Sequence, residues 1–173
     1  MKIAVSACLL GENCKYNGGN NYSEKVKEYI KGHEVISVCP EVMGGLSTPR
    51  IPSEIVNGIV TNKNGDNVDM EFRRGAEAAF RKIIANNVDL CILQSRSPSC
   101  GVKEIYDGTF SGHKIKGQGI FARMLMDAGI TPVEVDRTGI EEVTVEDIEV
   151  AKSRGNVIKL MCRGTIDENG KVI

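Results

Sequence analysis

The chain has 173 residues, of which 41% are hydrophobic and 26% charged, and its net charge is −1 at pH 7. These values predict a soluble globular protein large enough to bury roughly two thirds of its unfolded surface. The near-neutral charge gives no reason to expect nucleic acid or an anionic membrane as a partner, and the lack of tryptophan argues against an aromatic platform for nucleic-acid bases.

The amino-terminal segment MKIAVSACLL is too short to span a bilayer, and it is followed at once by glycine and charged residues. It also lacks the basic region and the small-x-small cleavage site of a signal peptide. We therefore interpret it as the first strand of a cytoplasmic protein. The chain contains six cysteines, and in a reducing compartment this number indicates metal binding or thiol chemistry rather than a disulfide framework.

Strands and helices alternate along the chain. Short apolar runs rich in β-branched residues predict buried parallel strands at 2–7, 35–39, 89–94 and 131–135. Helical periodicity predicts helices at 23–31, 69–87 and 118–128. The expected apolar face of the second helix consists of Phe72, Ala76, Ala79, Phe80, Ile83 and Ile84. This alternation implies right-handed crossovers, and we expect an α/β fold with a three-layer, Rossmann-like, mostly parallel sheet.

Two segments depart from this alternation. Within residues 47–68, prolines are followed by a sequence that predicts a small hairpin insertion with Asn64-Gly65 at its turn. After about residue 138 a segment resembling a capping box precedes a predicted helix, and a predicted hairpin around residues 168–170 follows. We therefore expect a main α/β domain over residues 1–137 and a C-terminal αββ appendage over 138–173, packed on the same domain.

Three cysteines occupy equivalent places, each where a predicted strand gives way to a loop: Cys8, Cys39 and Cys100. In an open α/β sheet, the loops at the carboxyl ends of parallel strands converge on one crevice. Three thiolates can hold a soft metal centre and leave one coordination position open to chemistry. Each cysteine taken alone is equally consistent with a buried thiol or a turn, whereas the three together favour a metal site.

The same loops carry other polar side chains. Glu41 follows Cys39 by two residues, where a carboxylate can move protons beside a metal-bound group or simply favour the start of a helix. Ser97 and Ser99 give the segment SPSCG two hydroxyl groups suited to orienting a small ligand. Cys14 can be a fourth ligand or a neighbour of the site. Packing or surface roles are expected for Cys91, Cys162, His33 and His113.

Five segments resemble successive blocks of the thiouracil desulfidase family, in the family's order, over about residues 1–135. They are VSACLLGENCKYNGG, VCPEVMGGLSTPRIPSE, SRSPSCG, IYDGTFSG and KGQGIFARMLMDAGI. The resemblance implies a compact α/β domain with a Rossmann-like sheet. It also implies a [4Fe-4S] cluster held by Cys8, Cys39 and Cys100, which are the three cysteines selected above from strand ends.

The activity implied by this resemblance is a non-redox removal of sulfur from a small thiolated nucleobase such as 2-thiouracil. The iron without a protein ligand would act as a Lewis acid on the substrate sulfur and weaken the C–S bond to water. By resemblance, Glu41 moves protons, Ser97 positions the substrate or water, and Ser99 and Asn17 contact the substrate. Many relatives carry aspartate where this chain has Asn17, so the chain lacks that proton acceptor.

Two other functions stay open at this stage. An iron–sulfur or sulfide carrier needs the cysteines but neither Glu41 nor Ser97. A structural zinc protein is the third candidate, although the short C-x2–4-C pairs typical of zinc sites do not occur here.

The C-terminal stretch IEEVTVEDIEVAKSRGNVIKL is locally similar to homoserine dehydrogenase. No G-x-G-x-x-G follows the first predicted strand, so the similarity does not extend to dinucleotide binding. We interpret this stretch as a packing or oligomerisation element.

Overall fold

The computed structural model describes residues 1–130, 132–136 and 139–140. The described residues include the predicted alternation of strands and helices except for residue 131, the first of the fourth predicted strand. Most of the predicted appendage at 138–173, including Cys162, lies outside them. The division of the chain at residue 137 therefore stays a prediction.

The described residues contain one five-stranded sheet with the order β2-β1-β5-β8-β9. Its strands are β1 (Lys2–Ser6), β2 (Glu34–Val38), β5 (Leu90–Gln94), β8 (Val133–Asp136) and β9 (Gly139–Ile140). The first four are parallel, and β9 pairs antiparallel with β8. This confirms the four predicted strands and the mostly parallel sheet. The sequence did not predict β9, because a strand of two residues carries no periodicity.

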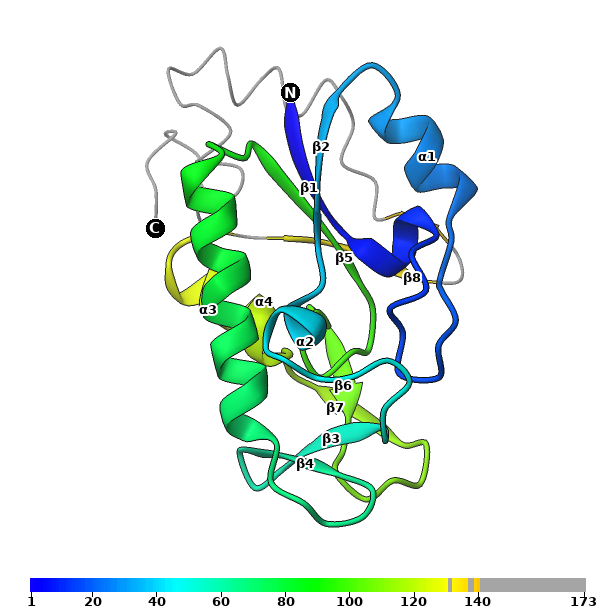
Figure 1. The fold of residues 1–173 in the computed structure, drawn as a ribbon, viewed down its shortest axis with the longest axis vertical. Helices are drawn as coiled ribbons and strands as arrows, with labels where there is room; N and C mark the ends of the chain where they lie inside the picture. The colour runs from blue at the N-terminus through cyan, green and yellow to red at the C-terminus, as the bar shows by residue number, and fades with distance from the viewer. Residues whose placement is uncertain (131, 137–138, 141–173) are drawn as a thin grey trace.

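Helices cover both faces of the sheet, with α1 (Glu24–Ile30) on one side and α3 (Asp69–Ala85) and α4 (Ile120–Asp127) on the other (Figure 1). From β1 the chain steps outward to β2, then crosses back to β5 and continues to β8. Because such crossovers are right-handed, this reversal sends α1 and α3 to opposite faces. The predicted three-layer fold is confirmed, and the reversal falls between β1 and β5, where sheets of this kind bind ligands.

The helix ends and faces follow from local sequence. The backbone N–H of Val26 donates to the Ser23 hydroxyl at 3.3 Å, which confirms Ser23 as the N-cap of α1. In α3, the predicted face is buried at Phe72, Ala76, Ala79 and Ile83. Ile84 is 47% exposed, so its assignment to that face was wrong. Residue 84 lies about 100° around the helix from residue 83, beyond the edge of the buried stripe. No helix of the described residues is long and apolar enough to cross a membrane.

The core is centred on β1, whose residues Ile3, Ala4 and Val5 are fully buried. A central parallel strand is covered by helices on both faces, which is why these positions form a continuous apolar run rather than an alternating one. Cys91 in β5 belongs to the same core, as predicted.

The predicted hairpin insertion is confirmed as β3 (Ser53–Val56) and β4 (Ile59–Asn62), but the predicted turn was wrong. The strands are joined by Asn57-Gly58, where both residues have positive φ, +50° and +79°. Such a turn matches the twist of the two strands. Asn64-Gly65 lies in a second turn that is followed by only one antiparallel bridge, between Thr61 and Asn67.

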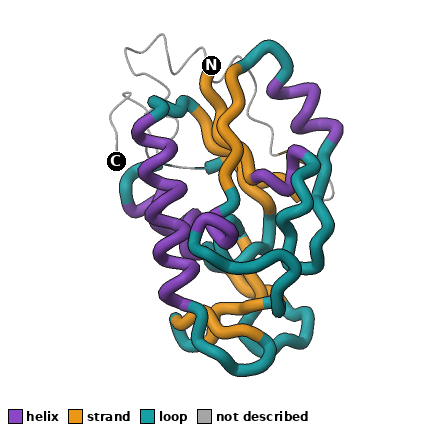
Figure 2. Tube along the Cα trace, viewed as in Figure 1, coloured by secondary structure: helices purple, strands orange, loops and turns teal. Residues whose placement is uncertain are grey.

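A second hairpin, formed by β6 (Glu104–Tyr106) and β7 (Lys114–Lys116), was not predicted. Its strands of three residues are too short to show alternation. β6 contacts β3 of the first hairpin. Figures 1 and 2 show both hairpins at the same end of the molecule, beyond the carboxyl ends of the sheet strands.

A short helix, α2 (Pro40–Met43), follows β2 and lies directly on α3. A Cβ atom added at Gly75 would be 1.7 Å from the carbonyl oxygen of Pro40, and one added at Gly44 would be 1.9 Å from that of Glu71. The two backbones are therefore in contact, and two glycines make this contact possible. The position of α2 fixes the residues at its start, Cys39 and Glu41.

Replacing Gly75 with alanine tests this contact. In a helix interior, alanine is normally more stable than glycine by about 1 kcal/mol. Here the added methyl group must push α2 away, and overpacking typically costs 1–3 kcal/mol. Because the contact is with backbone, we expect the upper end of this cost less the gain in helix propensity, so Gly75→Ala should lower the free energy of unfolding by about 2 kcal/mol in a denaturant titration. Glu77→Ala, at an exposed position of the same helix, is the control and should change it by less than about 1 kcal/mol. A stabilised Gly75→Ala protein would contradict the contact.

Candidate active site

A cavity of about 910 Å³ lies at the carboxyl ends of β1, β2 and β5. Cys8, Cys39 and Cys100, each following one of these strands, all line it. The two hairpins contribute further lining residues, among them Glu54 and Tyr106. The structure therefore brings together the three cysteines that the sequence singled out, and the hairpin insertion forms part of the wall.

Cys8 is held at the carboxyl end of β1 by a short 3-10 helix, η1 (Ala7–Leu10). η1 ends at Gly11, whose φ of +92° lets the chain turn back. The backbone N–H groups of Gly11 and Asn21 donate to the Cys8 carbonyl at 3.2 and 2.9 Å. Burial raises the pKa of the Cys8 thiol, while a hydrogen bond from the Asn21 side chain opposes this effect.

Cys39 precedes α2, and its carbonyl accepts a hydrogen bond from the backbone N–H of Met43 at 2.9 Å. The thiols of Cys39 and Cys14 are hydrogen-bonded to each other. This interaction lowers the pKa of the Cys39 thiol and raises that of the Cys14 thiol. Cys14 lines the same cavity as the three cysteines, so both alternatives from the sequence, fourth ligand and neighbour of the site, stay predictions.

Cys100 lies in a loop that is seated on the first turn of α4. The backbone N–H groups of Ile120 and Phe121 donate to the carbonyls of Pro98 and Ser99 at 2.8 and 2.9 Å, so the loop satisfies donors that a helix start leaves free. A Cβ atom at Gly119 would be 2.5 Å from the Ser99 carbonyl carbon, which shows how closely the two segments pack. Burial raises the pKa of Cys100, and a hydrogen bond from Ser6 opposes this.

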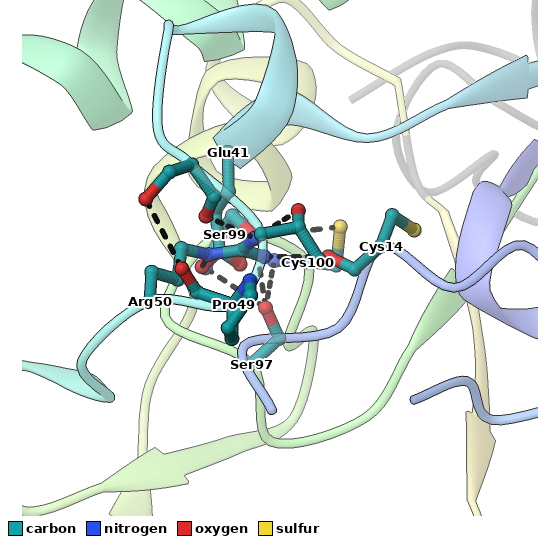
Figure 3. Close-up of polar contacts among 9 residues, drawn as sticks. Cys14, Glu41, Pro49, Arg50, Ser97, Ser99 and Cys100 are labelled. Atoms are coloured by element: carbon teal, nitrogen blue, oxygen red, sulfur yellow. Dashed lines mark hydrogen bonds and ion pairs between the residues drawn. The ribbon is translucent and has the colours of Figure 1, made fainter. Parts of the chain in front are cut away.

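Glu41, Ser97 and Ser99 form one hydrogen-bonded chain at the edge of this group (Figure 3). The Ser99 hydroxyl donates to Glu41 Oε2 at 2.9 Å, and the hydroxyls of Ser97 and Ser99 are 2.8 Å apart. The Ser99 hydroxyl also faces the sulfur of Cys100 at 3.7 Å, and either serine can donate the bond between the two hydroxyls. Ser99 is 1% exposed whereas Ser97 is half-buried, so Ser97 is the hydroxyl nearer to solvent.

Arg50 is a site residue that sequence reasoning missed. Its side chain is only 8% exposed. The guanidinium donates to Glu41 Oε1 at 3.2 Å, to the carbonyl of Cys14 at 2.8 Å and to Thr48 Oγ1 at 3.1 Å (Figure 3). Arg50 thus joins the loop that follows Cys8 to the start of α2. In the sequence it stands in a proline-bearing loop, where nothing distinguishes it from a surface arginine.

The structure does not bring Asn17 into the cavity. Its side chain is exposed, and its amide oxygen accepts a hydrogen bond from the backbone N–H of Gly19 at 2.9 Å in a local turn. The neighbouring residues Asn20 and Asn21 line the cavity instead. The histidines also lie away from the cavity lining: His33 contacts the amino terminus, and exposed His113 contacts Ser111.

Comparisons with known proteins agree with this arrangement. The 2-thiouracil desulfurase family matches residues 3–136. An uncharacterized protein of Bacillus subtilis (strain 168), YbbK, is 39% identical over 137 residues, which are 73% of this chain and 91% of that protein. A solved structure of a [4Fe-4S]-dependent thiouracil desulfidase, TudS, matches with a TM-score of 0.74 and 35% identity, over 88% of this chain and 97% of that chain. The chain belongs to the 2-thiouracil desulfurase family, as its sequence motifs predicted.

A second family, homoserine dehydrogenase, matches residues 106–172. The match covers less than half of the chain and falls mostly outside the described residues. It agrees with the local similarity seen in the sequence and carries no activity to this chain.

Arg50→Ala tests how strongly the site depends on its buried cation. The substitution takes the guanidinium away from Glu41 and from the carbonyl of Cys14. Breaking a buried ion pair by removing one partner typically costs 3–5 kcal/mol. We expect a loss of about 3 kcal/mol in the free energy of unfolding of the metal-free protein, measured by denaturant titration.

Arg73→Ala is the matched control, because Arg73 pairs with Asp69 on the surface and its side chain is 54% exposed. Exposed pairs contribute about 0–1 kcal/mol. Equal losses in the two variants would show that Arg50 is not the centre of a buried network.

Proposed function

We propose that this protein is a [4Fe-4S]-dependent desulfidase that removes sulfur from a small thiolated pyrimidine such as 2-thiouracil. The observation that carries the proposal is the meeting of three cysteines from three strand ends in one cavity, beside the Glu41–Ser99–Ser97 chain. The family match and the likeness to TudS support it. The cavity is large enough for a ligand of this size.

The thiols of Cys8, Cys39 and Cys100 fit an iron–sulfur cluster. Among the described residues, no group of three or more histidine, cysteine, aspartate or glutamate side chains is placed to hold a single metal ion. A cluster held by three thiols would need Cys8, Cys39 and Cys100 at one site, and all three line the same cavity. We assign these three thiols as its ligands and Cys14 as a neighbour. When bound, the cluster supplies an iron without a protein ligand, which acts as a Lewis acid on the substrate sulfur.

Glu41 is the proposed proton carrier. Replacing the C=S group of a thiopyrimidine by C=O consumes one water and releases hydrogen sulfide, with no net transfer of electrons. The attacking water must give up a proton, and sulfide must gain protons as it leaves. Arg50 and Ser99 hold the two carboxylate oxygens of Glu41 beside the cavity, where it can accept the first proton and return it.

The half-buried hydroxyl of Ser97 is the proposed positioning group. Its oxygen accepts hydrogen bonds from the backbone N–H groups of Ser99 and Cys100, each at 3.1 Å, which fixes its place beside the cluster ligand. It lines the cavity and can orient a water or the substrate. Buried Ser99 holds Glu41, and its proposed contact with the substrate is secondary. Asn17 is the least supported of the proposed substrate contacts, because it lies outside the cavity lining.

A reducing cytoplasm suits this site. Cys8, Cys14, Cys39 and Cys100 form no disulfide bond, and thiolate ligands require a compartment that keeps cysteines reduced. An iron–sulfur or sulfide carrier remains the second candidate function, since it would use the same thiols. A carrier has no use for the ordered Arg50–Glu41–Ser99 contacts, which favour an enzyme.

Metal content tests the ligand assignment. We expect about four irons and four acid-labile sulfides per chain after anaerobic reconstitution, as a [4Fe-4S] cluster requires. Serine at Cys8, Cys39 or Cys100 should abolish this content, whereas Cys14→Ser and Cys91→Ser should retain it. Zinc is measured in the same samples. Zinc in place of iron, or loss of iron in the Cys14 variant alone, would contradict the assignment.

Glu41→Gln separates an enzyme from a carrier. Glutamine keeps a hydrogen-bonding side chain for Ser99 and Arg50 but cannot accept the proton. General acid–base groups typically contribute about 10²–10⁴-fold to the rate, so sulfide release from 2-thiouracil should fall at least about 100-fold while iron and sulfide content stay unchanged. Thr61→Ala, a change away from the cavity lining, is the control for handling. Full turnover by the glutamine variant would remove Glu41 from the mechanism.

A further inference from the structure

The cavity gathers aromatic side chains in a chain that has few of them. The sequence contains four tyrosines, four phenylalanines and no tryptophan. Half of these aromatic residues line the cavity: Tyr16, Tyr22, Tyr106 and Phe110. The other half includes Phe72 and Phe121 of the core. Aromatic rings can stack on a flat partner, so their collection at the wall of this cavity indicates a flat ligand.

Phe110 differs from the three tyrosines in its backbone. Its φ is +56°, a conformation that is strained for a bulky side chain. Such strain persists only where the surroundings enforce it, and it collects at functional sites. Arg96, which also lines the cavity, has a φ of +60°, and its backbone forms a bridge with Ile105.

A carboxylate from the other hairpin enforces the conformation of Phe110. Glu54 Oε1, on β3, accepts hydrogen bonds from the backbone N–H groups of Gly108 and Phe110 at 3.0 and 3.2 Å. A Cβ atom at Gly108 would be 2.6 Å from the Ile55 carbonyl oxygen, so the loop is pressed against β3. At its base, the backbone N–H of Asp107 donates to the carbonyl of His113 at 3.0 Å. These contacts make the loop 107–113 rigid, and the loop positions Phe110 at the cavity wall.

Two of the three lining tyrosines make other contacts. Tyr22 packs beside Gly11, where an added Cβ would be 3.3 Å from its ring. Tyr16 lies next to the ammonium group of Lys15, 6.0 Å from the ring centroid. Both are 43% exposed. Phe110 is the phenylalanine of the lining, and it carries no hydroxyl group to direct toward a polar partner.

We propose that Phe110, on the rigid loop between β6 and β7, provides the aromatic face on which the pyrimidine ring of the substrate stacks. The inference rests on the proposed function and adds the residue that orients the ring. Base–aromatic stacking is tolerant of substituents, because every base has a π face. Phe110 lines the same cavity as Ser97 and the three cysteines, so a pyrimidine stacked on its ring would occupy the space that these residues share.

Tryptophan at position 110 makes the contact visible, because the chain has no tryptophan of its own. In the reconstituted Phe110→Trp protein, we expect uracil, which contains no sulfur to remove, to quench the fluorescence in a saturable manner. Ile115→Trp is the matched control, since Ile115 is in the same hairpin, is 50% exposed and does not line the cavity. It should show only weak quenching that rises linearly with concentration. Equal quenching in the two proteins would overturn the proposal.

Phe110→Gly separates stacking from packing. Glycine adopts positive φ without strain, so the thermal midpoint should stay unchanged or rise if Phe110 serves the ligand. The KM for 2-thiouracil should rise about ten-fold with kcat little changed, because stacking binds substrate and transition state alike. Phe110→Tyr, which keeps the ring, should restore the KM. A lower midpoint and an unchanged KM would show a structural role and overturn the proposal.

The quenching by uracil does not require turnover, whereas the KM for 2-thiouracil does, so the two measurements test different proposals. If the reconstituted wild-type protein releases no sulfide from 2-thiouracil, the proposed function fails, and the comparison of tryptophan variants still decides whether Phe110 contacts a pyrimidine. If the wild type is active and Phe110→Gly has the same KM, the function stands and the stacking proposal fails.

Discussion

The contact between the backbones of α2 and α3 is the constraint on which the site depends. Gly44 and Gly75 allow the two helices to touch without intervening side chains. α3 is a long helix with a buried apolar face, so it gives α2 a fixed support. α2 has only four residues and could not hold a position by itself. Because Cys39 and Glu41 stand at the start of α2, this contact determines where the thiol and the carboxylate lie.

The ion pair between Arg50 and Glu41 adds an electrostatic restraint on α2 to the steric contact with α3. Its side chain links the start of α2 to the loop that contains Cys14, and its backbone N–H donates to the carbonyl of Tyr16 at 2.7 Å. The start of α2, next to Cys39, and the loop that contains Cys14 are thereby held together. A buried charge is costly unless it is paired and hydrogen-bonded, and the partners of Arg50 meet that condition. Arg50 contacts only Oε1 of Glu41, so Oε2 is available to accept the hydrogen bond from Ser99.

The sequence predicted the parts of this molecule that depend on periodicity and failed where tertiary contacts decide. The parallel strands are continuous apolar runs, so the cysteines that follow them could be placed at one edge of the sheet from the sequence alone. Arg50 could not, because only its burial makes it different from a surface residue. α2 and the strands of the second hairpin, β6 and β7, are too short for a pattern. The turn of the first hairpin was misplaced because two Asn-Gly pairs were available and the pairing of β3 with β4 chose the first.

The three cysteines are far apart along a chain that is made from one end. Cys8 and Cys39 follow the first two strands, but the loop of Cys100 rests on the first turn of α4, which includes Phe121. At a translation rate of about 5–20 residues per second, roughly ten seconds separate the synthesis of the first and last of these segments. During that interval the nascent chain has an incomplete set of thiols and no closed cavity. Any metal centre that uses all three is therefore inserted late, after almost the whole domain has been synthesised.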